Sequence, residues 1–135
     1  MSQMNDACRK VLESVGNALA CGVFDLERKQ AIEIVHVPEF SDVQQEMITH
    51  AIMNLFRGIN AKLLANRAHE QIGKPVMKEK GFREIQMAFE ENFYFSKTIK
   101  NGNAALILVT KENTNIGMAW VQLKSVIPIV EPLIP

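Results

Sequence analysis

This chain of 135 residues contains three histidines and two cysteines, side chains that can act as nucleophiles, bases or metal ligands. The sequence contains neither a C-x-x-C nor an H-x-x-x-H pattern, so the usual spacing of metal ligands is missing. His36, His50 and His69 fall in a predicted strand, in a predicted helix and beyond the regular part of that helix. We therefore expect structural or surface roles for them and predict no metal-binding residue.

Cys21 is the group that could act as a nucleophile, with a distant histidine as its base. It lies in an apolar run, which disfavours a reactive thiolate and predicts a buried, inert thiol. A disulfide between Cys21 and Cys8 is the alternative, and it is disfavoured because nothing in the sequence indicates secretion. We predict no catalytic residue.

Two further features could line a binding pocket. Asp25 closes a predicted strand and could be a carboxylate in a pocket, although no partner for it is apparent. Trp120 and the run from Phe93 to Phe95 could line a ligand site, but core packing explains these rings more simply. The glycines form neither G-x-x-x-x-G-K-[ST] nor G-x-G-x-x-G, so the chain is not itself a P-loop nucleotidase. We predict no cofactor.

Composition and charge narrow the class of protein. Fifteen basic residues balance fifteen acidic ones, so the chain lacks the positive charge that binding to nucleic acid or an anionic membrane requires. Net neutrality favours association into an oligomer. No apolar run approaches the roughly 18 residues of a membrane span, and the first residues do not resemble a signal peptide. We expect one soluble, cytoplasmic domain over residues 1–135, with no nucleic-acid partner and no membrane span.

Hydrophobic periodicity predicts the element order α-β-β-α-β-β-β-α. A short first helix is capped by Asn5 or Asp6, a long helix capped by Ser41 continues to Leu64, and a last helix begins at Ile116. The predicted strands are residues 18–26, 31–37, 82–89, 93–100 and 104–110. A lysine-containing loop over residues 73–81 separates the long helix from the third strand.

The predicted strands differ in how their apolar residues are distributed, and this difference predicts their order. Residues 18–26 and 104–110 are apolar on both faces, so these strands should be central. The third strand alternates Ile85, Met87 and Phe89 with polar or small residues, which is typical of an edge strand. We predict an α+β fold with a five-stranded, mainly antiparallel sheet of order 2-1-5-4-3. The long helix covers one face and the terminal helices cover the other.

The long helix has more apolar surface than one sheet requires. At roughly 100° per residue its apolar positions span an arc of about 180°, whereas packing on a sheet needs about 100°. Met53 and Leu64 fall on the otherwise polar arc, together with Arg57 and Asn60. One interpretation is that the helix also meets another chain; the other is that these are scattered surface apolar residues.

Two local motifs add to the order of elements. Residues 101–110 are predicted to form a turn followed by a buried strand ending in Thr110, and residues 113–119 an Asn-rich cap followed by a helix start with small residues. Asp25 lies at the end of the first strand. In these features the sequence resembles the Roadblock/dynein light chain family, whose first strand often ends in Asp. Two features depart from the family pattern: the first hairpin turn lacks a glycine, and the loop over residues 73–81 is long.

The resemblance implies a profilin-like fold, a homodimer or heterodimer joined through the long helix and third strand, and a role as scaffold or regulator of Ras-like GTPases. We therefore expect a non-enzymatic dimeric regulator or scaffold that binds a small Ras-like GTPase, with Arg57 as the candidate for an arginine finger. A structural adaptor independent of any GTPase and a small-ligand-sensing domain are the alternatives. The expected dimer-interface residues are Ile52, Phe56, Ile59, Ile85, Met87 and Phe89, and the expected partner-binding residues are Met53, Arg57, Asn60 and Leu64.

Overall fold

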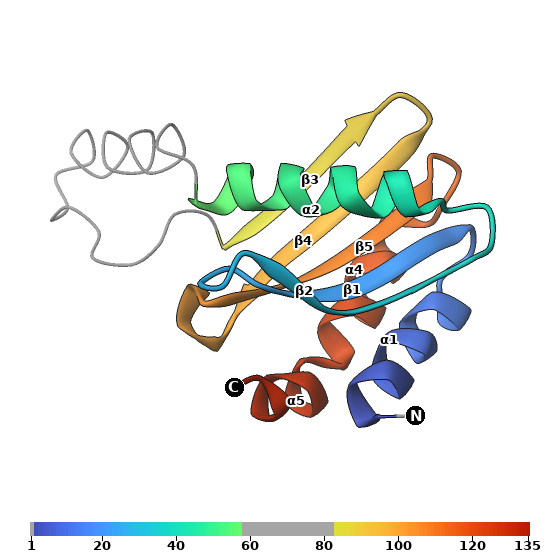
Figure 1. Cartoon of the computed structure of the whole chain (residues 1–135). Helices are drawn as coiled ribbons and strands as arrows, with labels where there is room; N and C mark the ends of the chain where they lie inside the picture. The colour runs from blue at the N-terminus through green and yellow to red at the C-terminus, as the bar shows by residue number, and fades with distance from the viewer. Residues whose placement is uncertain (1, 58–82) are drawn as a thin grey trace, which may run out of the picture.

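The computed structural model describes residues 2–57 and 83–135, and its elements follow the predicted order (Figure 1). The strands are β1 (Ala18–Asp25), β2 (Gln30–His36), β3 (Glu84–Phe89), β4 (Asn92–Ile99) and β5 (Ala104–Lys111). The helices are α1 (Gln3–Ser14), α2 (Asp42–Arg57), α4 (Ile116–Ser125) and α5 (Ile127–Val130), with short 3-10 turns η1 (Lys100–Gly102) and η2 (Glu131–Leu133). The predicted end of the long helix and the loop over residues 73–81 lie outside the described residues.

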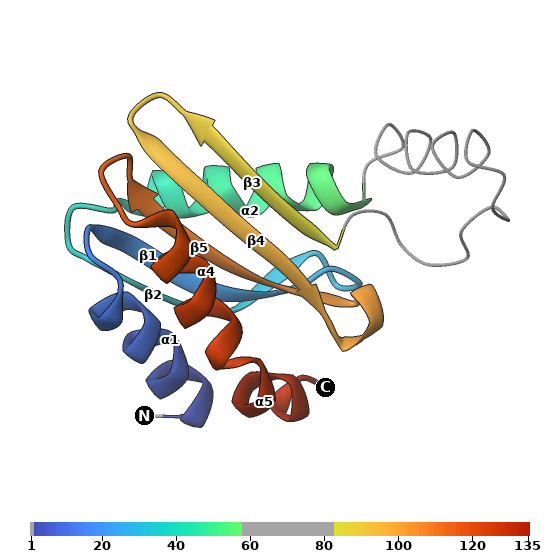
Figure 2. The ribbon, with the colours of Figure 1, turned by 180° about the vertical axis from the view of Figure 1, so that it is seen from behind.

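The five strands form an antiparallel sheet in the order β2-β1-β5-β4-β3, which confirms the predicted order. Every residue of β5 from Ala104 to Thr110 is buried, and so is nearly all of β1, as their apolar runs predicted. β2 and β3 form opposite borders of the sheet, as Figures 1 and 2 show from front and back. Residues of β3 are half-buried or exposed, which agrees with the predicted edge position.

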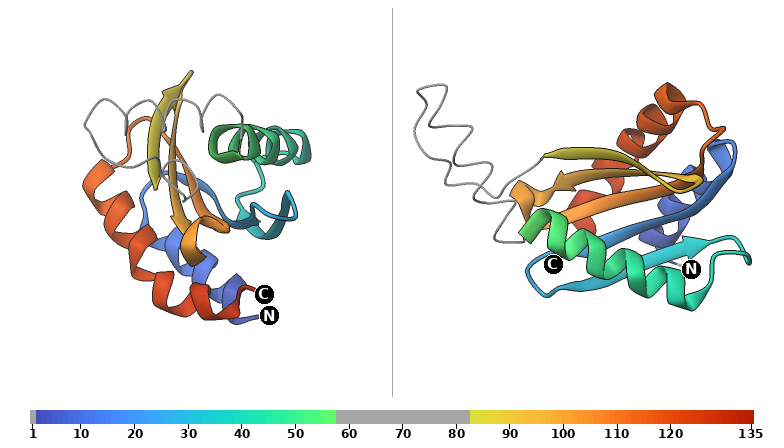
Figure 3. Two further views of the ribbon diagram at one scale, coloured as in Figure 1. Left: turned by 90° about the vertical axis from the view of Figure 1, so that its left-hand side faces the viewer. Right: turned by 90° about the horizontal axis from the view of Figure 1, so that it is seen from above.

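Helices lie on both faces of the sheet (Figure 3). Each face has its own hydrophobic core. α2 covers one face, where Ile52 and Phe56 join Phe24 and Ile107 in a buried cluster. α1, α4 and α5 cover the other face, with side chains such as Val11 buried against the sheet. Full burial of each large apolar side chain contributes about 1.5–3 kcal/mol, so these two layers hold the helices in place.

Side-chain caps fix where the helices begin. The Ser2 Oγ accepts from the Asn5 N–H at 3.0 Å, so α1 begins before Asn5, and the prediction of a cap at Asn5 or Asp6 was wrong. The reason is that the buried face of α1 already starts at Met4. Ser41 does cap α2, because its Oγ accepts from the Gln44 N–H at 3.2 Å while the Gln44 side chain accepts from the Ser41 N–H at 2.8 Å.

The last helix is broken at the prolines. α4 ends at Ser125, and α5 restarts with Pro128 in its first turn, where a missing N–H is tolerated. Pro132 lies in the first turn of η2 in the same way. The tail is nevertheless anchored, since Val130 and Ile134 are buried.

Candidate interaction surface

Cys21 and Cys8 are free thiols buried between α1 and β1. The hydrogen bond with the Cys8 thiol, followed by burial, raises the pKa of the Cys21 thiol well above its ordinary value. A protonated, inaccessible thiol is a poor nucleophile. The interpretation of Cys21 as a buried, inert core residue is confirmed, and the two cysteines form no disulfide.

The two described histidines lie on different elements, His36 on β2 and His50 on α2. His36 Nδ1 lies 2.8 Å from the Val37 carbonyl oxygen, and its Nε2 lies 3.0 Å from the amide nitrogen of Gln45. His50 is exposed on α2, and His69 lies outside the described residues. Over residues 2–57 and 83–135, no group of three or more His, Cys, Asp or Glu side chains is placed to hold a metal ion. In the same part of the chain, no helix has the length and apolar character needed to cross a bilayer.

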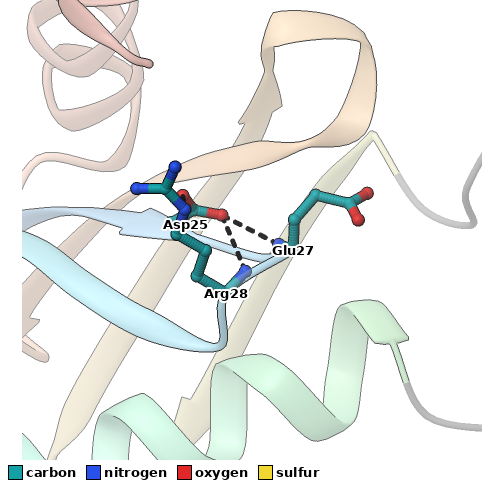
Figure 4. Close-up of polar contacts among 3 residues, drawn as sticks. All are labelled: Asp25, Glu27 and Arg28. Carbon is teal, nitrogen blue, oxygen red and sulfur yellow. Dashed lines mark hydrogen bonds and ion pairs between the residues drawn. The ribbon is translucent and has the colours of Figure 1, made fainter.

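Asp25 closes the hairpin between β1 and β2 (Figure 4). Its Oδ1 accepts hydrogen bonds from the backbone N–H groups of Glu27 and Arg28, both at 2.9 Å, and its Oδ2 lies 3.8 Å from the Arg28 Nε. Lys29 then takes a left-handed φ of 58°, the conformation that a glycine often supplies. The turn therefore needs no glycine, and the Asp25 carboxylate has a structural role.

The aromatic rings of Phe93, Phe95 and Trp120 pack on one another. The ring centroids of Phe95 and Trp120 lie 5.3 Å apart at 88°, and those of Phe93 and Phe95 lie 6.4 Å apart at 79°. Both pairs have the edge-to-face geometry that aromatic rings prefer. These contacts fill the space between α4 and β4, in agreement with the core-packing interpretation.

β3 leaves backbone groups unpaired at the border of the described sheet. The Thr98 N–H donates to the Arg83 carbonyl oxygen at 2.8 Å, which fixes the residues whose backbone faces β4. Hydrogen-bonded pairs recur at every second residue of an antiparallel ladder. The backbone N–H and C=O groups that point away from the sheet are therefore those of Glu84, Gln86 and Ala88.

The face of β3 that meets α4 is polar. The Glu84 carboxylate lies 2.6 Å from the Lys124 Nζ, and the Trp120 Nε1 donates to the Gln86 Oε1 at 2.7 Å. Lys124 Nζ also lies 5.2 Å from the centre of the Trp120 ring, a cation–π distance. These contacts hold β3 against α4, and no other strand of the described residues pairs with its outer backbone.

The opposite face of β3 is apolar. Ile85 packs against the core beneath α2, Met87 is half-buried, and Phe89 is 59% exposed. These three residues form a row that becomes more exposed towards the end of the strand. Apolar side chains beside unpaired backbone groups are the combination that favours pairing with another strand.

The site residues predicted on the long helix lie partly within α2 and partly outside the described residues. Ile52 and Phe56 are 2% and 0% exposed because the chain's own sheet covers them, and Met53 is half-buried in the same cluster. In the single chain, Ile52 and Phe56 therefore pack within the chain's own core, whereas Met53 remains partly accessible. Arg57 is the last residue of α2. Three predicted site residues, Ile59, Asn60 and Leu64, lie outside the described residues.

Two exposed apolar residues of α2 were not predicted as site residues. Val43 and Met47 are 65% and 63% exposed, and Ala51, one helical turn further on, is also exposed. We call these three residues the outer stripe of α2. Helical periodicity could have indicated their exposure. Val43 precedes Ile52 by nine residues, and nine steps of about 100° place it on the opposite side of the helix.

Comparisons with solved structures identify the fold. The sequence matches no protein-family model and no curated protein. MglC from Myxococcus xanthus superposes with a TM-score of 0.62 at 16% identity, covering 98% of this chain and 100% of that one. MglB from the same organism gives 0.70 at 11% identity, covering 98% and 95%. A Roadblock/LC7 domain from Streptomyces avermitilis gives 0.65 at 10% identity, covering 96% and 98%. The chain therefore has the Roadblock/LC7 fold that its strand order and sequence motifs predicted.

Proposed function

We propose that this protein is a non-enzymatic, cytoplasmic dimer that binds and regulates a small Ras-like GTPase. The proposal is supported by the Roadblock/LC7 fold and by the resemblance of its sequence to a family of GTPase regulators. The observation that carries it is the pairing-competent edge of β3, which borders the same face of the sheet as α2. A dimer through that edge would place two copies of α2 on one continuous face.

In this dimer, β3 pairs with β3 of a second copy in an antiparallel register centred on Gln86. This register lets all three outward-facing residues take part, because Gln86 meets the partner's Gln86 and Glu84 meets the partner's Ala88. On the α2 side, Ile85 then lies opposite the partner's Met87. The apolar row of β3 gains a second apolar layer, which favours this pairing over solvent exposure.

The GTPase would dock on the outer stripe of α2. An exposed apolar stripe bordered by polar residues is typical of a protein-binding helix. By binding one nucleotide state of the GTPase more tightly than the other, the dimer would shift the population of its switch conformations. Arg57, at the end of α2, is the residue we propose to test as a contributor to hydrolysis.

The test is binding of purified protein to Ras-like GTPases loaded with GDP or with a non-hydrolysable GTP analogue. We expect retention of at least one GTPase, with a preference for one nucleotide state. Failure to retain any candidate in either state would overturn the GTPase proposal.

A structural adaptor that joins proteins without a GTPase is the second candidate. It is favoured by a separate observation, namely that α4 also exposes apolar side chains, Met118 and Val121 at 45% and 62%. α4 lies on the opposite face of the sheet from α2 (Figure 3). Recovery of a stable partner whose binding ignores the nucleotide state would favour the adaptor.

A further inference from the structure

The other border of the sheet, formed by β2, has its own unpaired backbone groups. The Val37 N–H donates to the Leu19 carbonyl oxygen at 2.9 Å, and Val35 pairs with Cys21. By the alternation of an antiparallel ladder, the N–H and C=O groups of Ile34 and His36 point away from β1. Among the described residues, no further strand covers this edge.

Edge strands are usually protected by charged side chains or prolines, and β2 has little such protection. Its one acidic residue, Glu33, turns towards the start of α1, where the Ser2 Oγ lies 3.4 Å from its Oε1. The His36 ring is held by the Val37 carbonyl oxygen and by Gln45. With respect to residues 2–57 and 83–135, the middle of the edge is therefore open to an incoming strand.

A groove of about 420 Å³ lies beside this edge on the α1 side of the sheet. The register of β2 shifts opposite Val23 and Phe24, which makes Ile32 the extra residue of a β-bulge. Six residues line the groove: Ser2, Gln3, Met4, Ile32, Glu33 and Leu133. Its wall therefore combines three apolar side chains (Met4, Ile32 and Leu133) with two neutral polar ones and a single carboxylate. Leu133 is 39% exposed.

We propose that the β2 edge and this groove bind an extended segment of a partner protein by strand addition. The segment would hydrogen-bond to the backbone of Ile34 and His36. It would place an aliphatic side chain against Ile32 and Leu133, and a lysine or arginine opposite Glu33. A second copy of β2 is a poorer occupant, because Gln30–His36 contains no lysine or arginine to meet the carboxylate.

This inference is independent of GTPase binding. β2 and β3 are opposite borders of the sheet, so a dimer formed through β3 would leave both β2 edges accessible. A peptide that binds at β2 can therefore be detected whether or not a GTPase binds elsewhere.

The experiment uses the full chain as bait for a displayed library of random twelve-residue peptides, followed by affinity measurement with synthetic copies of the enriched sequences. We expect enriched peptides with alternating β-branched residues and one basic residue. N-methylation of the peptide backbone should abolish binding at every second position only, because alternate amides face β2.

Two substitutions in the protein check the site. Ile34→Pro removes an outward N–H that the β1 ladder does not use, and it should weaken peptide binding by about tenfold or more. Ile34→Val is the matched control that keeps this N–H and should bind normally. Glu33→Gln should weaken binding and reduce its dependence on salt.

Three results would overturn the proposal. They are the absence of enriched peptides, an N-methylation profile without the two-residue period, and self-association of the chain that Ile34→Pro abolishes. The last result would mean that a second copy occupies the edge. The N-methylation profile is measured on the unaltered protein, so it holds even if Ile34→Pro disturbs folding.

Discussion

Asp25 shows how one side chain can replace a glycine in a turn. Replacing it by alanine removes the acceptor for the N–H groups of Glu27 and Arg28, which should lower the free energy of unfolding by about 1–3 kcal/mol. Asp25→Asn keeps an acceptor oxygen and should cost less. Urea unfolding of both variants measures the difference. Equal stability of wild type and Asp25→Ala would refute this role.

Glu84 gives a dependence of stability on pH. The hydrogen bond from Lys124 holds the pKa of the Glu84 carboxyl below its ordinary value of 4.5. Burial raises this pKa, whereas the positive charges of Lys124, Lys97 and Arg83 lower it further. Because the folded pKa is lower than the unfolded one, the stabilisation is complete above pH 4.5 and is lost as the pH falls through the folded pKa.

The check is to compare wild type with Glu84→Gln in urea at pH 7 and at pH 3. We expect the wild type to be more stable at pH 7 and the difference to shrink at pH 3. The effect should be small, since both side chains of the pair are partly exposed. A difference that grows on acidification would contradict the assigned sign.

At the scale of elements, β1 and β2 approach closely at Gly22. A Cβ added there would lie 2.9 Å from the Glu33 carbonyl oxygen and 3.2 Å from the Ile34 Cγ1. The backbone of β2 would have to shift to make room for this Cβ, and its hydrogen bonds to β1 oppose such a shift. Gly22→Ala should therefore destabilise the fold by about 1–3 kcal/mol. Gly16→Ala is the control, because a Cβ there meets nothing within 4 Å. Thermal unfolding of both variants would decide, and equal melting temperatures would refute the close approach.

α2 and α4 offer a matched pair of surface substitutions. Met47→Glu on the outer stripe should abolish GTPase binding, because it places a charge in the proposed apolar contact. Val121→Glu on α4 alters a side chain of nearly equal exposure on the other face and should leave binding intact. Both proteins should fold like the wild type. If Val121→Glu lost GTPase binding and Met47→Glu kept it, the docking surface would be on α4 and not on α2.

The positions of the strands in the sheet could be predicted because the pattern of apolar residues along a strand indicates which of its faces are buried. β1 and β5 are apolar on both faces and lie in the centre, while β3 alternates and lies at a border. Caps were harder, because Ser2 and Asn5 are both suitable residues and only the burial of Met4 decides between them. The first hairpin turn was predicted, but the hydrogen bonds of Asp25 within it and the left-handed conformation of Lys29 were not, because no residue type in the turn marks them.

For the candidate surface, the sequence does not decide which side chains of α2 the sheet covers. Ile52 and Phe56 belong to the apolar arc of α2, but an arc of about 180° does not say which part faces the sheet. Their burial makes Val43 and Met47 the exposed part. Ile85, Met87 and Phe89 could be placed at an edge from their alternation, whereas the outward direction of the Gln86 backbone required the register of β3 and β4.

At the scale of the whole molecule, the two sheet borders differ in what they can bind. β3 has backbone groups that point away from the sheet and a row of apolar side chains on its α2 face. Its other face is held by contacts with α4. β2 combines outward groups with a groove that contains one carboxylate. A second copy of β3 suits β3, because antiparallel pairing about a two-fold axis places each Glu84 opposite the partner's Ala88. An asymmetric, basic segment suits β2.

The symmetric pairing can be tested by mass and by cross-linking. The wild type should show twice the monomer mass in solution at micromolar concentration, and Ile85→Lys or Met87→Lys should give monomer or insoluble protein. A register centred on Gln86 brings its Cα atom about 5.5 Å from that of the partner's Gln86, within the roughly 4.4–6.8 Å range of disulfides.

Under mild oxidation, Gln86→Cys should therefore form a covalent dimer, seen on a non-reducing gel. Ala88→Cys is the control, because Ala88 meets the partner's Glu84 and its own counterpart lies several residues away along the strand. The native Cys8 and Cys21 are buried and should not react. Cross-linking of Ala88→Cys but not of Gln86→Cys would show a different register, and a monomeric wild type would rule out the β3 dimer.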